Sequence, residues 1–312
     1  MINSVVVNVL HLSPSPLDRA TFLDKTIESL ERNGVNCDVA IVPGDIGSRS
    51  PVDYARFLPQ VTKRRLANEY DLIHSHDGLT APAALSQVGI PKVASLWGTD
   101  VFDDWKRLLS QSVYFADETI VTSEEMADLL YRDCRVIPHG VDMDLFTVHD
   151  TTLSKDNLNW SSDAKHALFP YNPERPEKRY NLAKRAVAEA ENEYGESIEL
   201  KTVYGESYER IPEYMNAADV LLITSEYEGG PYTVKEAMAC NLPVVSTNVG
   251  DVSEYLTDVN PSIVAAESNI PDAIVKVLEA GHRSNGRKKA QNISMRRTGY
   301  RIQSIYEEVL ET

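Results

Sequence analysis

Short apolar segments rich in β-branched residues alternate with segments of helical periodicity along almost the whole chain, and this alternation constrains the fold most strongly. The first half predicts strands at residues 5–10, 37–42, 71–75, 92–96, 118–123 and 134–138. Apolar residues recur at helical spacing between them, as at 17–33 and 52–68. Strands and helices in repeated order predict a parallel sheet, and strands that are apolar throughout are buried on both faces.

The alternation is interrupted once and then resumes. Residues 145–165 are polar and predict an interdomain connection with little core of its own. Beyond it we predict strands at 166–170, 197–203, 219–225, 242–247 and 261–266, and helices at 176–194, 208–217, 231–241 and 284–311. The 312 residues are also about twice the roughly 150 expected for one domain, which favours two domains.

The predicted fold class is therefore α/β, with two tandem doubly wound domains of the Rossmann type. Residues 1–144 form the first domain and residues 145–283 the second. Residues 284–312 form a C-terminal helix that we expect to pack back on the first domain. In such domains a ligand binds in the crevice outside the carboxyl ends of the strands.

The chain is acidic overall, with 31 basic and 47 acidic residues and a formal net charge of −16. This excess opposes nucleic-acid binding, because affinity for nucleic acids comes mainly from Lys and Arg side chains that neutralise phosphates. The C-terminal segment is the exception, with the cations Arg283, Arg287, Lys288, Lys289, Arg296, Arg297 and Arg301. They predict either a peripheral contact with an anionic membrane or, more simply, neutralisation of two acidic domains.

Cysteine content and hydropathy limit the cellular locations to be expected for the protein. Cys37, Cys134 and Cys240 are far apart and odd in number, which argues against a disulfide framework and against a thiol metal site. No apolar stretch approaches the roughly 18 residues that a membrane span needs, and the first residues lack the pattern of a signal peptide. We therefore expect a cytoplasmic location, with any membrane association at the cytoplasmic face.

Residues 225–256 carry the most informative motif. A predicted strand ends in a loop with Glu228, Gly229 and Gly230, and Pro231 stands where a helix would begin. Glycines before a helix let backbone N–H groups approach a ligand, and a helix N-terminus favours negative charge. Glu236 follows inside the helix, and a carboxylate can accept two hydroxyl hydrogen bonds, which suits the vicinal diol of a ribose. Taken alone, the two glutamates could equally be ordinary solvated residues.

With its surroundings, this motif resembles the retaining, metal-independent glycosyltransferases of family 4, which have the GT-B fold with an interdomain cleft. The resemblance rests on the two glutamates, on EAMAC and VGDVSE after them, and on SLWGTDVF, VIPHGVDMDLF, FPYNPERPEK and IPEYMNAADVLLITS elsewhere. It implies that Glu236 binds the ribose hydroxyls and that Glu228 lies beside the donor sugar. It further implies that the loop between them contacts the sugar and phosphate, through Gly229, Gly230, Pro231 and Tyr232.

The resemblance also assigns the diphosphate clamp to Arg175 and Lys178, with Arg179 as a possible substitute. Independent physics supports cations at this place, because a departing nucleoside diphosphate builds up negative charge. The same residues stand in a mixed-charge run, PERPEKR, which would ordinarily be a solvated helix start. Their proximity to Glu228 is a hypothesis at this point.

The first domain is where the resemblance places the acceptor. His74 and His76 alternate on one strand face, which makes a metal site conceivable, but no third ligand is apparent and crevice histidines are the simpler interpretation. Trp97 replaces a histidine of many relatives and could stack on a sugar face. Asp100 is then the ionisable candidate near the transfer point, or simply the N-cap of a helix at 101–116.

Two neighbouring positions complete the acceptor side. His139 falls where the family often has Asn at the domain junction and is expected to shape the hinge. His11, with SPSP close behind it, replaces a glycine-rich loop of many relatives.

The resulting expectation is a hexosyltransferase that moves a sugar, with retention, from a UDP- or GDP-sugar to a hydroxyl of a glycan, a glycolipid or a small molecule. Neither a cofactor nor a metal is expected. Two alternatives stay open: a non-catalytic protein that binds nucleotide-sugars, and another GT-B enzyme such as a nucleotide-sugar epimerase. The altered Trp97 position motivates the first alternative, and the EAMAC segment argues against the second.

Overall fold

The computed structural model describes residues 6–17, 21–46, 48–102, 110–130, 132–228 and 230–311. The chain divides into two compact units. The first comprises Met1–Gly140 together with Met295–Thr312, and the second comprises Val141–Ser294. Each unit is built on one parallel sheet, so the predicted α/β class with two Rossmann-type domains is confirmed.

The sheet of the first unit has the strand order β2-β1-β3-β4-β5-β6, and all of its pairings are parallel. Its strands are β1 (Asn8–Ser13), β2 (Asn36–Ile41), β3 (Leu72–Ser75), β4 (Lys92–Ser95), β5 (Glu118–Val121) and β6 (Arg135–Val136). Every strand overlaps its predicted range. The first begins three residues later than expected, at Asn8 rather than at residue 5.

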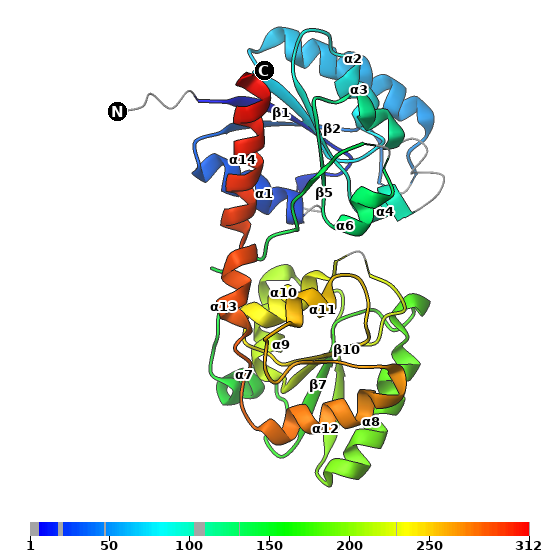
Figure 1. Cartoon of the computed structure of the whole chain (residues 1–312), viewed down its shortest axis with the longest axis vertical. Coiled ribbons are helices and arrows are strands. Elements are labelled where there is room, and N and C mark those ends of the chain that lie inside the picture. The colour runs from blue at the N-terminus through cyan, green and yellow to red at the C-terminus, as the bar shows by residue number, and fades with distance from the viewer. Residues whose placement is uncertain are drawn as a thin grey trace. The chain divides into compact units, whose positions relative to one another are not determined.

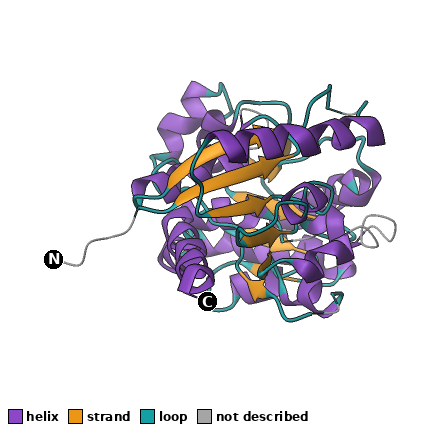
Figure 2. Cartoon of the chain, turned by 90° about the horizontal axis from the view of Figure 1, so that it is seen from above, coloured by secondary structure: helices purple, strands orange, loops and turns teal. Residues whose placement is uncertain are grey.

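Helices cover both faces of this sheet, as Figures 1 and 2 show. They are α1 (Thr21–Arg32), α2 (Pro51–Ala67), α3 (Ala81–Leu85), α4 (Gly98–Phe102), α6 (Glu124–Asp128) and α14 (Met295–Glu311). Because side chains alternate along a strand, Val9 and Leu72 pack with α1 and α14 while Leu10 and Ile73 pack with α2 and α3. The C-terminal helix α14 thus completes the core of the first unit, beside α1 (Figure 1).

The sheet of the second unit has the order β11-β10-β9-β7-β8, again parallel throughout. Its strands are β7 (Lys165–Phe169), β8 (Ile198–Thr202), β9 (Val220–Ile223), β10 (Val244–Ser246) and β11 (Ile263–Val264). One face packs against α8 (Tyr180–Tyr194) and α12 (Ile270–Ala280). The other packs against α9 (Ile211–Ala217), α10 (Tyr232–Ala239), α11 (Val252–Leu256) and α13 (Gly286–Ala290).

Two predicted segments differ from the structure. Residues 145–165, predicted to be a connection without core, contain the helix α7 (Thr151–Asn157), which packs on α9 and pairs its Lys155 with Asp219 at 2.9 Å. The single helix predicted at 284–311 is broken: α13 and a short 3-10 turn precede α14, and the chain passes between the units at 294–295. The break follows Ala290, where the 3-10 turn Gln291–Ile293 ends in the extended residue Ser294, while Gly286 lets α13 approach α10, because a Cβ there would lie 2.9 Å from the Cα of Met238.

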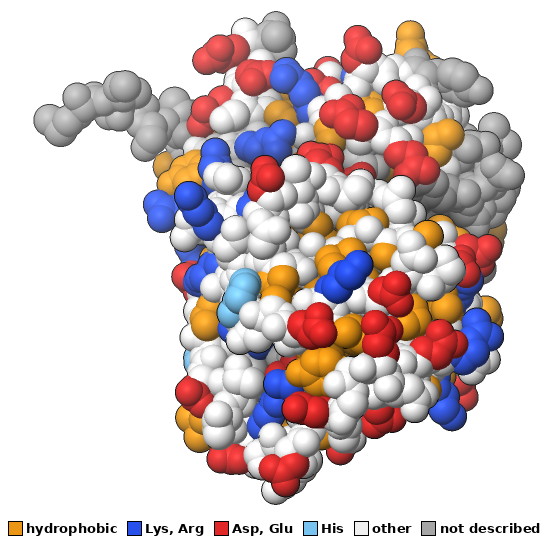
Figure 3. All heavy atoms as spheres, turned by 60° about the horizontal axis from the view of Figure 1, so that its bottom comes forward, with side chains coloured by type: hydrophobic (Ala, Val, Ile, Leu, Met, Phe, Trp, Pro, Cys, Tyr) orange, Lys and Arg blue, Asp and Glu red, His pale blue; other side chains and the backbone are white. Residues whose placement is uncertain are grey.

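The charge of the surface is mixed rather than segregated on the face that Figure 3 shows. There, Lys and Arg side chains are interspersed with Asp and Glu side chains. Among the described residues no helix is long and apolar enough to cross a membrane.

Candidate active site

The topology of the second unit brings two loops together. The chain runs from β7 outward to β8 and then returns to β9 on the other side of β7, so the order reverses between β7 and β9. Ligands of open parallel sheets bind at the carboxyl ends of strands flanking such a reversal. Here the two loops are tied by the Glu226 N–H, which donates to the Glu177 carbonyl at 2.9 Å, and by the Thr224 hydroxyl, which donates to the Lys178 carbonyl at 2.9 Å.

These ties place Lys178 against Glu228. The Lys178 Nζ lies 2.6 Å from Glu228 Oε1, and the same oxygen accepts a hydrogen bond from the Ser225 hydroxyl at 2.6 Å. The ammonium also lies 4.3 Å from the ring centroid of Tyr171. Only 5% of the Lys178 side chain and 11% of the Glu228 side chain is exposed, so the pair is shielded from water. A shielded ion pair is far more sensitive to loss of one partner than an exposed one.

The two arginines beside Lys178 do not reach Glu228. Arg175 is half exposed and forms an ion pair with Glu177 at 2.6 Å. Arg179, which adopts the left-handed conformation with φ 55°, forms an ion pair with Glu267. Lys178 is thus the cation of this run that the fold places on Glu228.

A hollow of about 540 Å³ lies at the carboxyl ends of β9 and β10, and neither Lys178 nor Glu228 lines it. Arg179, Ser225 and Thr247 are among the residues that line it. This volume lies within the roughly 300–1,000 Å³ of small-molecule sites.

Glu236 is buried on α10, and only 6% of the residue is exposed. Burial raises the pKa of Glu236 to about 7, while a hydrogen bond from the Tyr208 hydroxyl and the positive charge of Lys235 act in the opposite direction. The carboxyl group of Glu236 is therefore harder to ionise than that of an exposed glutamate. Tyr208 was not predicted as a site residue, because nothing in the sequence distinguishes one tyrosine in a helical segment far from the motif.

The loop that carries Glu228 is held by a close approach of the chain. Gly230 has φ 103°, which only glycine adopts readily, and Pro231 is the N-cap of α10 rather than its first residue. A Cβ at Gly250 would lie 2.7 Å from the Glu228 carbonyl oxygen, so the turn before α11 presses on this loop. Tyr232 begins α10, and Gly229 lies outside the described residues.

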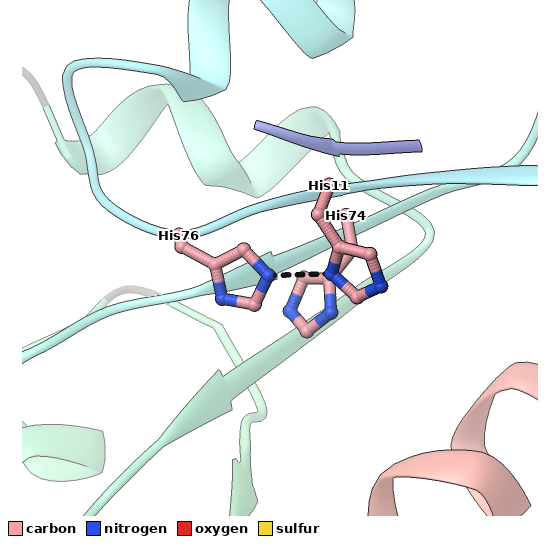
Figure 4. Close-up of side chains that lie close together, drawn as sticks. All are labelled: His11, His74 and His76. Atoms are coloured by element: carbon pink, nitrogen blue, oxygen red, sulfur yellow. Dashed lines mark hydrogen bonds between the residues drawn. The ribbon is translucent and has the colours of Figure 1, made fainter. Parts of the chain in front are cut away.

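In the first unit, three histidines lie close together on and after the neighbouring strands β1 and β3 (Figure 4). His11 on β1 is the register partner of His74 on β3, and His76 follows β3. Nδ1 of His11 lies 2.8 Å from Nε2 of His76, while His74 bonds the Tyr306 hydroxyl at 2.6 Å and the Ser95 hydroxyl at 2.8 Å. The sequence predicts no third ligand beside His74 and His76, whereas the pairing of β1 with β3 brings His11 next to them.

These histidines form a neutral network. Burial lowers the pKa of His11 to about 3 and the pKa values of His74 and His76 well below the usual range. One potential ligand atom from each residue lies within 4.8 Å of the others. Two nitrogen ligands of a tetrahedral zinc ion lie roughly 3.4 Å apart, and a buried dication with only neutral ligands is costly. A metal would also have to replace hydrogen bonds that the rings already make.

Trp97 and Asp100 have structural partners in the first unit. The Trp97 ring is stacked on His139, with centroids 4.8 Å apart, and its Nε1–H donates to the His76 carbonyl at 2.8 Å. Asp100 lies in the first turn of α4, which begins at Gly98 rather than at residue 101. Its carboxylate accepts a hydrogen bond from the Trp97 N–H at 2.9 Å, which is a capping interaction. Roles of both residues toward an acceptor remain predictions.

Two other charged features are structural as well. Asp142 and Asp144 form an Asp-x-Asp sequence, and Asp142 Oδ1 accepts hydrogen bonds from the N–H groups of Asp144 and Leu145, as in a turn. Several C-terminal cations donate to backbone carbonyl groups, namely Arg283, Arg287, Lys289 and Arg301. These hydrogen bonds tie the basic segment to the backbone of neighbouring elements and so stabilise the fold.

Known structures share this architecture. Sucrose-phosphate synthase from Thermosynechococcus elongatus superimposes with a TM-score of 0.80 over 98% of this chain and 99% of that chain, at 17% identity. Anabaena HepE, solved in complex with UDP-glucose, superimposes with a TM-score of 0.66 over 96% of this chain and 99% of that chain, also at 17% identity. The fold is therefore that of the GT-B glycosyltransferases.

Sequence comparison agrees. An uncharacterized glycosyltransferase of Methanocaldococcus jannaschii is 23% identical over 275 residues, which cover 77% of this chain and 76% of that protein. D-inositol 3-phosphate glycosyltransferase 2 of Catenulispora acidiphila is 26% identical over 273 residues, which cover 69% of this chain but only 64% of that protein. The chain thus spans less than two thirds of the length of the second relative.

Two family models cover most of the chain. The model of glycosyltransferase family 4 matches residues 13–145, and the model of glycosyl transferases group 1 matches residues 176–296. The chain belongs to these group 1, family 4-like glycosyltransferases, which transfer sugars. The first model falls on the unit with the histidine network, and the second falls on the unit with Lys178, Glu228 and Glu236.

Proposed function

We propose that this protein is a retaining, metal-independent hexosyltransferase that uses a nucleotide-diphosphate sugar. The observation that carries the proposal is the shielded contact between Lys178 and Glu228 at the strand reversal of the second unit. It joins a cation for a phosphate and a carboxylate for a sugar within one small region. Glu236, eight positions after Glu228, supplies a second carboxyl group on the adjoining helix.

In this proposal Glu236 accepts hydrogen bonds from the two ribose hydroxyls. Tyr208 holds the carboxyl group by its own hydrogen bond and so restricts its orientation. The burial of Glu236 strengthens bonds to a ligand, because little water competes for the carboxylate. HepE binds UDP and UDP-glucose within the same fold, which supports a nucleotide-sugar donor for this chain.

Lys178 then stabilises the diphosphate as it leaves. The α10 N-terminus, with Gly230 and Tyr232 at its start, adds backbone N–H groups and a positive dipole end. Arg175 is exposed and can turn from Glu177 toward a phosphate. Fixed positive groups of this kind stabilise charge that develops in the transition state, so a metal ion is not required for that purpose.

The transfer step needs no separate protein base to take the proton of the acceptor. The bond between the anomeric carbon and the diphosphate oxygen breaks, and its electron pair stays on the diphosphate. The acceptor hydroxyl attacks from the same face, and a departing phosphate oxygen takes its proton. Glu228 lies beside the sugar, where its negative charge stabilises the positive character that develops at the anomeric carbon. The products are a glycoside of retained configuration and a nucleoside diphosphate.

The test is to incubate the protein with UDP-, GDP- and ADP-sugars and to measure nucleotide release with and without a panel of glycan, glycolipid and small-molecule acceptors. We expect release from a UDP- or GDP-sugar that increases when a suitable acceptor is added. NMR of the product should show the anomeric configuration of the donor. Release from none of the donors, while nucleotide binding is retained, would refute the enzymatic function.

One observation favours a second candidate, a non-catalytic protein that binds nucleotide-sugars. Trp97 stands where many relatives have a histidine and is engaged in a stack with His139. Binding of a nucleotide-sugar without transfer to any acceptor would support this candidate. Conversion of the bound sugar to its epimer would instead identify a nucleotide-sugar epimerase.

A further inference from the structure

Tyr171 is an aromatic side chain that the proposed mechanism does not use. It stands two residues after β7, and the Lys178 Nζ lies over its ring, 4.3 Å from the centroid. The Phe169 ring packs against it in a T-shaped arrangement, with centroids 5.5 Å apart. Tyr171 also packs against the hydrophobic clusters on both faces of the second sheet. The ring is therefore a firmly held support for the ammonium group.

The contact between ring and ammonium holds the cation without using one of its hydrogen-bond donors. An ammonium group has three N–H donors, and one of those of Lys178 donates to Oε1 of Glu228 at 2.6 Å. A ring face attracts a cation through its quadrupole, most strongly where water is excluded. Only 5% of the Lys178 side chain is exposed, so this condition is met. The ammonium is thus fixed in place while its other N–H groups can donate to phosphate oxygens.

The hydroxyl of Tyr171 makes a second connection, to the helix that carries Glu236. Its oxygen lies 3.1 Å from Oγ1 of Thr233, the second residue of α10, and either hydroxyl can donate. Burial and the charge of Glu228 raise the pKa of Tyr171 well above its usual range, so the hydroxyl keeps its proton. The N–H groups of a first helical turn have no acceptor within the helix and can bind an anion. The hydrogen bond therefore ties the support of Lys178 to the start of α10.

We propose that Tyr171 is a positioning residue for the departing diphosphate: its ring holds the Lys178 ammonium, and its hydroxyl fixes that ammonium relative to Thr233 and the start of α10. This inference rests on the proposed function and adds to it a residue that need not touch the donor. It assigns separate tasks to the ring and to the hydroxyl, so the two can be tested separately.

The first experiment measures the affinity of the full chain for UDP and GDP by calorimetry. Tyr171→Leu removes ring and hydroxyl and should weaken binding of the nucleotide that the protein prefers about tenfold, because a cation–π contact away from water has about this effect. Tyr171→Phe keeps the ring and should weaken binding about threefold, as expected for one lost hydrogen bond. Tyr194→Phe is the matched control, since it removes a hydroxyl from α8 in the same unit, and it should bind as the wild type does. Wild-type affinity in Tyr171→Leu would overturn the inference.

Nucleosides distinguish positioning of the cation from general support of the fold. Uridine and guanosine lack the phosphates, so their affinities, measured by NMR titration, should be the same in Tyr171→Leu and in the wild type. Equal losses for nucleoside and diphosphate would assign Tyr171 a merely structural role and overturn the inference.

The hydroxyl is tested through its partner. Thr233→Val should weaken diphosphate binding as much as Tyr171→Phe does, and the double variant should lose no more than either single variant. Thr233→Ser, which keeps a hydroxyl at this place, should restore the affinity. Fully additive losses, or no recovery in Thr233→Ser, would refute the connection between Tyr171 and α10.

A last measurement separates this inference from the proposed function, because it needs no nucleotide. The ring current of Tyr171 should shift the Hε protons of Lys178 upfield in NMR spectra of Lys-labelled protein, assigned with Lys178→Arg. This shift should persist in Tyr171→Phe and disappear in Tyr171→Leu, or in Tyr171→Met should the leucine variant not fold. An unchanged shift without the ring would overturn the inference. If the wild-type protein binds neither nucleotide, the proposed function fails, while this measurement still decides whether Tyr171 holds Lys178.

Discussion

The Nζ of Lys178 lies 2.6 Å from Oε1 of Glu228, although 50 residues separate the two in sequence. Both side chains are shielded, and the loops that carry them follow the adjacent strands β7 and β9. The contact therefore depends on the topology of the sheet rather than on local sequence. In the absence of donor the Lys178 ammonium and the Glu228 carboxylate neutralise each other's charge. A bound diphosphate would share the ammonium with the carboxylate.

Lys178→Met should reduce kcat/KM for the donor by about 10²-fold or more, because a fixed cation facing the leaving group is lost. It should also destabilise the second unit by about 3–5 kcal/mol, since Glu228 would be left as an unpaired shielded carboxylate. Steady-state kinetics and urea unfolding measure the two effects. Arg175→Gln is the matched comparison and should cost less in both, because Arg175 is half exposed. Wild-type transfer by Lys178→Met would contradict the assignment.

The two glutamates should separate binding from chemistry. Glu236→Ala should weaken nucleotide binding about tenfold or more through loss of hydrogen bonds to the ribose, each of which is worth about 1.5–3 kcal/mol when one partner is charged. Glu228→Ala should lower kcat far more than it changes the affinity for UDP or GDP. Calorimetry and initial rates give the two quantities. Unchanged kinetics in both variants would show that the site lies elsewhere.

The turn before α11 should be intolerant of a side chain. Gly250→Ala must place a Cβ 2.7 Å from the Glu228 carbonyl oxygen at a positive φ, so the Glu228 loop has to move. We expect a loss of transfer of more than about tenfold, as misplaced catalytic groups commonly cause. Gly195→Ala is the control, since Gly195 has φ 79° but no atom within 4 Å of its Cβ position. Equal losses in both variants would attribute the effect to φ alone.

The first unit should lose stability in mild acid because of its histidine network. The pKa of His11 is lowered to about 3 in the folded state from the ordinary 6.5, so between these values the unfolded chain binds the extra proton. The free energy of unfolding should therefore be highest above pH 6.5 and fall below it, by up to about 1.4 kcal/mol per pH unit for each such histidine. Urea unfolding at pH 7.5, 6.5 and 5.5 measures this.

The control for this prediction is the exposed His282. His11→Gln should flatten the pH dependence, whereas His282→Gln should leave it as in the wild type. Parallel pH curves for His11→Gln and the wild type would show that the network does not titrate as expected.

Metal independence can be tested by chelation during nucleotide release and, at the three histidines, by addition of Co²⁺. Chelation by EDTA should leave nucleotide release unchanged, because the proposed mechanism stabilises the diphosphate with Lys178 and backbone groups. Added Co²⁺ should give no visible ligand-field band from His11, His74 and His76, since both ring nitrogens of His74 are engaged in hydrogen bonds, although Nε2 of His11 and Nδ1 of His76 have no such partner among the described residues. A tetrahedral Co²⁺ spectrum that disappears in His74→Gln would instead establish a metal site.

Much of the fold was predictable because buried parallel strands and their helices leave strong patterns. The polar segment at 145–165 hid α7, since a seven-residue helix shows hardly two turns of periodicity. The break before Met295 was hidden for a related reason: helical spacing continues on both sides of it. Gly286 marks the close approach that makes α13 pack on α10.

The candidate site was predictable only where the motif is continuous. Glu228 and Glu236 stand in one segment, but the partner of Glu228 depends on how β7 and β9 pair. The sequence assigned the diphosphate to Arg175 and Lys178, with Arg179 as a possible substitute, and only loop geometry shows that Lys178 is the one that contacts Glu228. His11 was likewise separated from His74 by 63 positions, and only the register of β1 with β3 brings the two together.

The return of α14 to the first unit has a consequence for the order in which the two units can complete their folding. Tyr306 is fully buried and bonds His74, 232 residues earlier in the chain, while Ile302 and Ile305 lie in the same core as Val9. A ribosome releases these residues only after the whole of the second unit, Val141–Ser294. The N-terminal unit therefore cannot close its core until the C-terminal unit has emerged, so the part translated first is finished last.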